Sequence, residues 1–236
     1  MKQFILFIFL SIIVSSCTEN PNTIELVDKK LSAKKYTEAL EIIDKIKKNN
    51  SNLKLLLIKK QLCENKLGKY GEAIKTVEKL VEKGNVDYLN QIAILHYKNG
   101  NIDKALSTME RLKLTIQNYG FPELFHLGLF EFGNSNYKKS LKYLNLAIEK
   151  RKYVDIYYYK ALCEIELGNY NEAILNLNEY EKAEGSNFNF FAKRAYANLM
   201  LGNKTEALID LEKISNISIE YEKEDISFFE LENLKN

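Results

Sequence analysis

The amino-acid sequence predicts an all-helical protein built from repeated helix pairs. Two prolines and ten glycines among 236 residues leave few turn signals for a strand-rich fold. Runs of Leu, Lys, Glu, Ile and Ala between polar breaks are typical of helices. Hydrophobic residues make up 46% of the chain, which is enough to give it a core. A third observation, a short stretch that recurs along the chain, indicates how the helices are organised.

The recurring stretch is "LGNYNEAI" at 167–174, which matches "LGKYGEAI" at 67–74 and "LGNKTEAL" at 201–208. "KNGNIDKAL" at 98–106 is a looser copy. Aligning the copies on the glycine defines a turn position in each of six units, occupied by Lys34, Gly68, Gly100, Ser135, Gly168 and Gly202. Because the spacing stays near 34 residues, the pattern indicates stacked units that share one continuous core.

Each residue type in the stretch has a physical reason. Glycine suits a first helix that ends in a sharp reversal, since it enters the left-handed region without steric cost. An aromatic residue two positions later is expected to open the second helix. A small residue five positions after the glycine is expected where the two helices approach closely; this set is Ala39, Ala73, Ala105, Ser140, Ala173 and Ala207. In the fourth unit Gly133 is displaced from the turn position, which predicts a longer turn there.

This glycine, aromatic and alanine pattern at a period near 34 resembles the tetratricopeptide-repeat family. The chain contains no Trp, and the family's consensus Pro at the end of the repeat does not occur in any unit. The resemblance implies a right-handed solenoid of helix pairs whose first helices line a concave groove. We expect six such units over residues 22–216 and a capping helix with a short tail over 217–236. The units are expected at 20–53, 54–87, 88–120, 121–153, 154–187 and 188–216.

The N-terminus has the organisation of a bacterial export signal. Lys2 precedes an apolar run, "QFILFIFLSIIV", which is too short to span a bilayer as a permanent helix. The following "SSC" resembles the lipobox, in which Cys17 is diacylated and becomes the new N-terminus. Residues 1–16 are then a lipoprotein signal peptide and residues 17–21 a short tether, with an exported, lipid-anchored protein on the cell or outer membrane. The alternative is an ordinary signal peptide with a chance cysteine.

The family resemblance also implies which side chains line the groove. Most of these positions are apolar or aromatic, although Asn65 and Asn90 are among them; the ten candidate binding residues are Ile58, Leu62, Ile94, Tyr97, Phe125, Leu129, Phe132, Tyr158, Leu162 and Tyr196. The family's polar clamp for a terminal carboxylate is missing, so we expect an apolar peptide or helix as the guest. The alternative is that this stripe is buried against neighbouring units or against the C-terminal helix.

No sequence feature predicts catalysis, a cofactor or a metal site. His96 and His126 have no partner at ligand spacing, and no phosphate-binding loop or nucleophile elbow occurs. Cys63 and Cys163 occupy the same position of two units too far apart for a disulfide, so buried thiols are expected. The 34 basic and 32 acidic residues are scattered along the chain, which argues against nucleic acid as a partner.

These features together predict a membrane-anchored adaptor or scaffold for an envelope protein or peptide. Lipoproteins of similar size and repeat number include pilotins and a component of the outer-membrane assembly machine. Two alternatives remain: a carrier that holds a small apolar ligand or glycan, favoured by an enclosed apolar cavity, and a purely structural spacer.

Overall fold

The computed structural model describes residues 22–46, 52–81, 88–116, 118–184 and 188–217. Within these ranges the chain forms twelve helices and no strand. Cys17, the expected signal peptide and tether, and all but the first residue of the expected C-terminal segment lie outside the described residues. The all-helical prediction is therefore confirmed for the described part of the chain.

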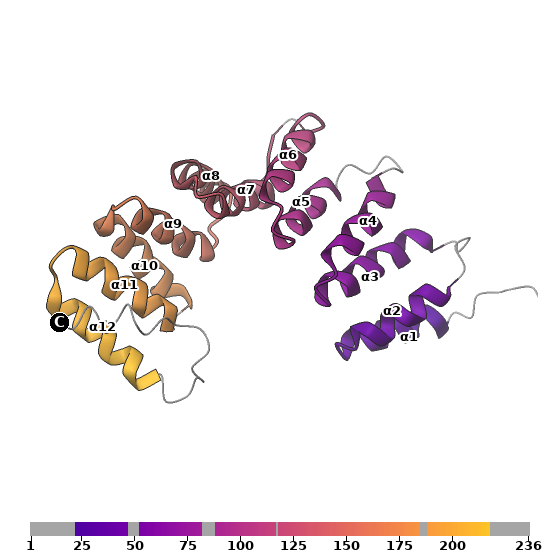
Figure 1. The fold of residues 1–236 in the computed structure, drawn as a ribbon, viewed down its shortest axis with the longest axis horizontal. Coiled ribbons are helices and arrows are strands. Elements are labelled where there is room, and N and C mark those ends of the chain that lie inside the picture. Colours follow the sequence, from indigo (N-terminus) through magenta and orange to yellow (C-terminus); the bar gives the residue numbers. More distant parts are fainter. Residues whose placement is uncertain (1–21, 47–51, 82–87, 117, 185–187, 218–236) are drawn as a thin grey trace, which may run out of the picture. The chain divides into compact units, whose positions relative to one another are not determined.

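The helices follow one another as first and second members of six pairs (Figure 1). Their bounds are α1 Asn22–Ser32, α2 Tyr36–Lys45, α3 Leu53–Lys66, α4 Tyr70–Val81, α5 Leu89–Lys98, α6 Ile102–Lys113, α7 Phe121–Gly133, α8 Tyr137–Lys150, α9 Asp155–Glu166, α10 Tyr170–Glu184, α11 Phe188–Met200 and α12 Lys204–Ile217.

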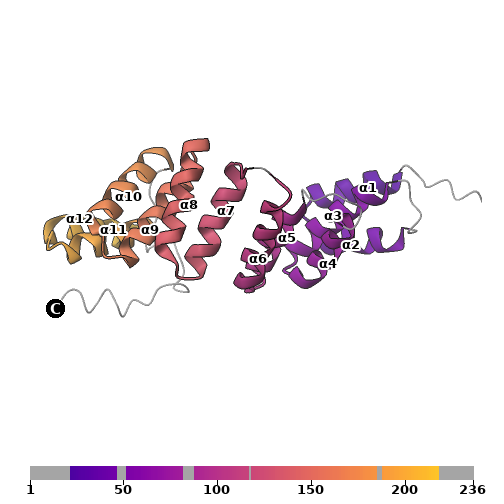
Figure 2. The same ribbon diagram turned by 90° about the horizontal axis from the view of Figure 1, so that it is seen from above.

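The chain divides into two compact units, residues 1–80 and 81–236. In the first unit α2 packs against both α1 and α3. In the second unit α5 packs on α6, α7 on α8, α9 on α10 and α11 on α12, and α8 and α10 also contact the first helix of the next pair (Figure 2). With the contact between α6 and α7, the first helices α7, α9 and α11 each lie between two second helices, which is the packing expected of stacked repeats.

The turn between the two helices of a pair has the same backbone geometry in all six units. The residue at the turn position has a positive φ in every unit: 56° at Lys34, 71° at Gly68, 76° at Gly100, 58° at Ser135, 77° at Gly168 and 80° at Gly202. In each case its N–H donates to the carbonyl three residues earlier, and the next N–H donates to a carbonyl of the last helical turn. These two bonds satisfy carbonyls that a helix end would otherwise leave unpaired.

The expectation of a longer fourth turn is wrong. Helix α7 ends at Gly133 and α8 begins at Tyr137, which is the same separation as in the other pairs. Ser135 takes the left-handed conformation itself, and Asn136 donates its backbone N–H to the Glu131 carbonyl at 2.8 Å. Gly133 is therefore the last helical residue and has no turn role.

Ser135→Gly is expected to stabilise the protein by about 0.5–1 kcal/mol. A side chain in the left-handed region costs about 1–2 kcal/mol, and the greater entropy of glycine in the unfolded chain offsets part of the gain. Chemical denaturation would measure the change in unfolding free energy. The matched control is the reverse change at an equivalent turn, Gly168→Ser, which should destabilise the protein. A Cβ at Gly168 would meet no atom within 4 Å, so the effect would come from the backbone conformation alone.

The small residues after each turn lie where the two helices touch. All five alanines of this set and Ser140 have no exposed surface. Ser140 Oγ donates to the Gly128 carbonyl at 2.7 Å, and Cys163 Sγ donates to Ser140 Oγ at 3.2 Å. The buried hydroxyl of the serine in the fourth unit is therefore satisfied by a backbone carbonyl of the facing helix.

Cys63 and Cys163 are both buried and outside any disulfide, as the sequence predicted. Burial raises the pKa of the Cys163 thiol to about 11. Because the thiolate is the reactive form, this cysteine is chemically inert at neutral pH.

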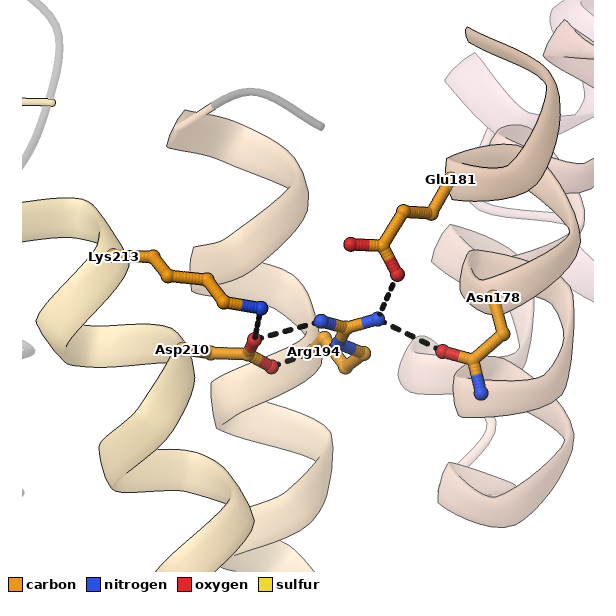
Figure 3. A network of polar contacts seen from close by, with 5 residues as sticks. All are labelled: Asn178, Glu181, Arg194, Asp210 and Lys213. Atoms are coloured by element: carbon orange, nitrogen blue, oxygen red, sulfur yellow. Dashed lines mark hydrogen bonds and ion pairs between the residues drawn. The ribbon is translucent and has the colours of Figure 1, made fainter. Parts of the chain in front are cut away.

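A charged cluster joins the last three helices of the second unit (Figure 3). Arg194 of α11 donates two hydrogen bonds to Asp210 of α12, each at 2.8 Å. Its remaining donors reach Asn178 at 2.9 Å and Glu181 at 2.6 Å, both on α10. These bonds raise the pKa of Arg194, and the bonds to Asp210 have the largest effect. The guanidinium also lies 4.6 Å from the centre of the Phe190 ring. A single side chain thus connects two successive repeats.

Candidate functional site

The predicted groove residues lie on the first helices with part of each side chain accessible. Ile58 and Leu62 belong to α3 in the first unit, and the other eight belong to α5, α7, α9 and α11 in the second unit. None of the ten is fully buried, and Leu62 and Tyr196 are the most open, each 36% exposed. The second unit therefore carries the larger continuous candidate surface.

Five partly accessible aromatic side chains from three successive first helices line this part of the second unit. They are Tyr97 of α5, Phe125 and Phe132 of α7, and Tyr158 and Tyr159 of α9, and we call them the aromatic surface. The ring centres of Phe125 and Phe132 each lie 6.1 Å from that of Tyr159. Tyr158 and Tyr159 are 6.0 Å apart with an angle of 76° between the rings. Edge-to-face contacts of this kind are favourable beyond the area they bury.

Tyr97 joins the surface through a contact that explains Gly133. A Cβ on Gly133 would lie 2.8 Å from Tyr97 Cε2, so a larger residue there would displace the ring. Tyr97 also packs on Phe130, with 5.0 Å between ring centres. The glycine that the sequence assigned to a longer turn in fact makes room for an aromatic ring from the preceding repeat.

Tyr159 was not predicted as a surface residue. It lies one position beyond the groove register, yet it contacts Phe125, Phe132 and Tyr158. The sequence signal is the run of three tyrosines at 157–159. Burial is the main cause that raises the pKa of both Tyr158 and Tyr159, so both hydroxyls stay protonated at neutral pH. They can therefore donate hydrogen bonds to a guest as well as present ring area.

The remaining predicted residues surround or lie apart from the aromatic surface. Ile94, Leu129 and Leu162 are half-buried aliphatic side chains on the same three helices. Tyr196 is placed differently, because its ring packs on Tyr170 of α10 at 6.1 Å. Ile58 and Leu62 belong to the other compact unit.

The alternative of internal packing accounts for part of this face. Phe125, Phe132 and Tyr159 pack against the core that contains Leu144 and Ile156. Each nevertheless keeps an accessible portion. One side of these rings therefore stabilises the stack of repeats, and the other side remains open.

A polar group borders the aromatic surface. His126 Nδ1 donates to Asn90 Oδ1 at 3.1 Å, and Asn90 Nδ2 donates to Glu123 Oε1 at 3.4 Å. The second carboxylate oxygen of Glu123 accepts the Gly120 N–H at 2.9 Å. Burial lowers the pKa of His126, against the smaller opposing effect of Glu123. His126 is therefore a neutral structural residue at pH 7, and it stacks 6.2 Å from Phe130.

A cleft of about 410 Å³ lies away from the groove residues, between α6 and α8 with α7 as its floor. Most of its lining side chains are polar or charged: Leu106, Glu110, Lys113, Tyr119, Leu124, Leu127, Glu131, Asn134, Asn136, Lys139, Lys142, Tyr143 and Leu146.

Several polar side chains of the cleft already form hydrogen bonds within the protein. The Glu131 carboxylate accepts from Asn136 Nδ2 at 2.8 Å, and Tyr119 Oη donates to the Met109 carbonyl at 2.6 Å. Burial raises the pKa of Tyr119 to about 12. The cleft is therefore not the enclosed apolar cavity that a carrier of an apolar ligand would need.

Among the described residues, no helix is long and apolar enough to cross a membrane. Nor do the described His, Cys, Asp and Glu side chains form any group of three that could hold a metal ion.

Comparison with solved structures shows the fold. A tetratricopeptide-repeat protein from Parabacteroides merdae is 21% identical, with 83% of this chain and 78% of that chain covered and a TM-score of 0.67. MamA from Desulfovibrio magneticus is 15% identical, with 74% of this chain and 99% of that chain covered and a TM-score of 0.64. A chain of the APC/C hetero-tetramer Cut9-Hcn1 is 17% identical, with 84% and 40% covered and a TM-score of 0.69.

No family model matches the sequence, and no curated protein matches it. The structural comparisons and the uniform geometry of the six turns both indicate the same fold, which is that of tetratricopeptide-repeat proteins.

Proposed function

We propose that this protein is an adaptor that binds an apolar segment of another protein on its aromatic surface. The observation that carries the proposal is a set of partly accessible rings from three successive repeats: Phe125, Phe132 and Tyr158 each contact Tyr159, and Tyr97 packs against α7 at Gly133. Large rings bury much area at a small cost in side-chain entropy, which is why they dominate binding hot spots. The fold supports this reading, because repeat arrays present extended binding faces.

The chemistry of the surface favours an apolar guest that also accepts hydrogen bonds. Ile94, Leu129 and Leu162 extend the aromatic surface with aliphatic groups, and the protonated tyrosine hydroxyls add donors. Lysine, arginine and asparagine are missing from the positions that would clamp a terminal carboxylate on α7. An amphipathic helix laid along the surface matches this combination best.

The adaptor works, in this proposal, at the bacterial cell envelope and is held there by lipid on Cys17. The support is the apolar run followed by "SSC" in the sequence. Two or more acyl chains on one cysteine would anchor the protein stably, whereas a single chain would not. The short tether would hold the repeats near the membrane surface.

Cys17→Ala is expected to abolish incorporation of a fatty-acid probe and to release the protein from the membrane fraction. Labelling of cells followed by fractionation measures both effects. The matched control is Cys163→Ala, which should keep lipid and location because that thiol is buried within the repeats. Undiminished labelling of the Cys17→Ala protein would rule out the anchor.

The adaptor proposal is tested by crosslinking in cells and mass spectrometry. We expect one envelope protein to be captured by the wild type and its yield to fall at least about tenfold in a Phe125→Glu, Leu129→Glu variant. Circular dichroism must first show that the variant keeps its helices. The control is Leu175→Glu on α10, which places a charge on a side chain already 66% exposed and away from the surface.

Each failure has a definite meaning. Equal capture by the wild type and the groove variant would show that the aromatic surface serves only packing, which contradicts the proposal. Loss of capture in the Leu175→Glu control as well would show that the effect is one of general surface charge. A spacer predicts no specific partner in any of the three proteins.

A further inference from the structure

Helix α8 carries a group of basic side chains that neighbouring acids do not neutralise. Residues 137–152 contain six basic residues and a single acidic residue, Glu149. Helix α3 has as many lysines as α8, but two of the α3 lysines pair with Asp28 of α1 and Asp44 of α2. The exposed α8 lysines that form no ion pair with any described residue are Lys138, Lys142 and Lys150.

The spacing of these lysines creates repulsion within the helix. Lys138 and Lys142 are four residues apart, and Lys139 and Lys142 are three apart, so both pairs are neighbours on the surface of α8. Like charges at such spacings destabilise a helix. Lys139 has a distant partner in Glu131 of α7, at 3.9 Å, and its side chain stays 67% exposed. Anions bound across these lysines would relieve the repulsion.

The lysines border the cleft between α6 and α8, next to exposed leucines. Lys139 and Lys142 line the cleft from α8, and Lys113 lines it from α6. Leu114, which follows Lys113, is 88% exposed, and Leu146 of the cleft wall is 37% exposed. Leucines beside lysines suit a membrane surface, because the leucines enter the apolar layer while the ammonium groups meet the phosphates of the head groups.

The type of cation favours a lipid surface over an acidic peptide. Arginine recognises a single carboxylate through two parallel hydrogen bonds, whereas lysine acts as a point charge. A fluid layer of phosphates requires charge density and no fixed geometry. The exposed acids Glu110 and Glu149 reduce the positive charge but are outnumbered. The set that we call the basic face consists of Lys113, Lys138, Lys139, Lys142 and Lys150.

We propose that the basic face and Leu114 form a docking surface for a membrane that contains anionic phospholipid. The proposal rests on the proposed location at the membrane, but it makes no use of the aromatic surface. The basic face lies on the second helices α6 and α8, whereas the aromatic surface lies on the first helices α5, α7 and α9. A lipid on Cys17 would restrain only the N-terminus, and docking would set which side of the second unit meets the membrane.

Vesicle binding by the full chain with Cys17→Ala tests the docking surface, because this chain carries no acyl group. The probes are vesicles of phosphatidylcholine alone and vesicles with about one third phosphatidylglycerol. We expect the anionic vesicles to bind at least about tenfold more tightly, and the difference to vanish in about 0.5 M salt. The N-terminal segment is identical in every protein compared, so its contribution cancels.

Lys138→Gln combined with Lys142→Gln, in the same chain, should weaken binding to the anionic vesicles by at least about tenfold. Binding to the neutral vesicles should not change. The matched control is Lys75→Gln combined with Lys79→Gln, which removes the same charge at the same spacing from two exposed positions of α4. This control should keep the affinity of the parent chain.

Leu114→Ser separates a membrane from other anionic partners. It should weaken binding to the anionic vesicles by about tenfold, because the leucine no longer enters the apolar layer. Leu175→Ser on α10 is its control, since that side chain is also exposed, at 66%, and lies outside the basic face. It should have no effect.

Three outcomes would overturn the proposal. Equal binding of neutral and anionic vesicles would exclude recognition of anionic lipid. An equal loss in the α4 control would show an effect of total charge alone. Unchanged binding by Leu114→Ser, with competition by soluble polyglutamate, would assign the basic face to an acidic protein. None of these results bears on the Cys17 anchor or the aromatic surface, because the vesicle assay uses neither.

Discussion

Arg194→Met will lower the free energy of unfolding of the second compact unit by about 3–5 kcal/mol. The Arg194 side chain is 12% exposed and that of its main partner Asp210 only 3%. Removing the guanidinium leaves the buried Asp210 carboxylate without its main ion-pair partner, and that uncompensated desolvation is the largest part of the cost. Because methionine keeps much of the packing against Phe190, the loss of stability measures the effect of removing the positive charge.

Two matched variants separate the charge effect from general disruption. Lys213 is the other cation near Asp210; its Nζ lies 3.8 Å from Asp210 Oδ1 and its side chain is 44% exposed. Lys213→Ala should lower the free energy of unfolding by less than about 1 kcal/mol. Arg194→Met combined with Asp210→Leu should recover most of the stability, because no buried charge remains. Urea denaturation of the four proteins measures all three differences. A double variant as unstable as Arg194→Met alone would show that the bonds to α10 carry the effect instead.

The turns could be predicted from sequence because their cause is local. A left-handed residue is required two positions before each second helix begins, and glycine supplies it in four of six turns. Lys34 and Ser135 were found by period alone, and both have positive φ. The fixed spacing therefore identified the backbone geometry even where the residue type did not.

The errors and omissions arise from contacts between helices. Gly133 was assigned to a longer turn because it is the glycine next to the fourth turn position, whereas its role depends on Tyr97 of the preceding pair. Tyr159 lies outside the groove register and enters the aromatic surface through rings on α7. Arg194 and Asp210 are 16 residues apart, a separation that carries no helical pattern. Such pairings depend on tertiary packing, which a single sequence does not reveal.

Gly128 on α7 presents a case in which repeat alignment and structure predict opposite effects. Gly128 lies seven residues before the turn position, where the other units have Val27, Gln61, Ala93, Ala161 and Ala195. Alanine is favoured over glycine by about 1 kcal/mol inside a helix. On that basis a larger residue at Gly128 should stabilise the chain. In the structure a Cβ at Gly128 would lie 2.7 Å from Leu144 Cδ2 and 2.8 Å from Leu144 Cγ.

Gly128→Leu should therefore destabilise the second unit by about 3 kcal/mol, at the upper end of the range for overpacked cores. Leu144 has no exposed surface and lies in the central cluster, so it cannot turn out of the way without opening another contact. The inserted side chain would also separate Ser140 Oγ from the Gly128 carbonyl that it binds. Urea denaturation measures the loss.

The decisive comparison is a swap of the large and small residues across the contact. Leu144→Ala alone should cost about 2–5 kcal/mol by leaving a cavity. In Gly128→Leu combined with Leu144→Ala the new side chain fills that cavity, so the double variant should be more stable than the sum of the two losses by at least about 2 kcal/mol. Simple additivity would show that α7 and α8 separate as a whole when Gly128 is enlarged. The glycine would then be required by helix spacing, and the Leu144 contact would not be the cause.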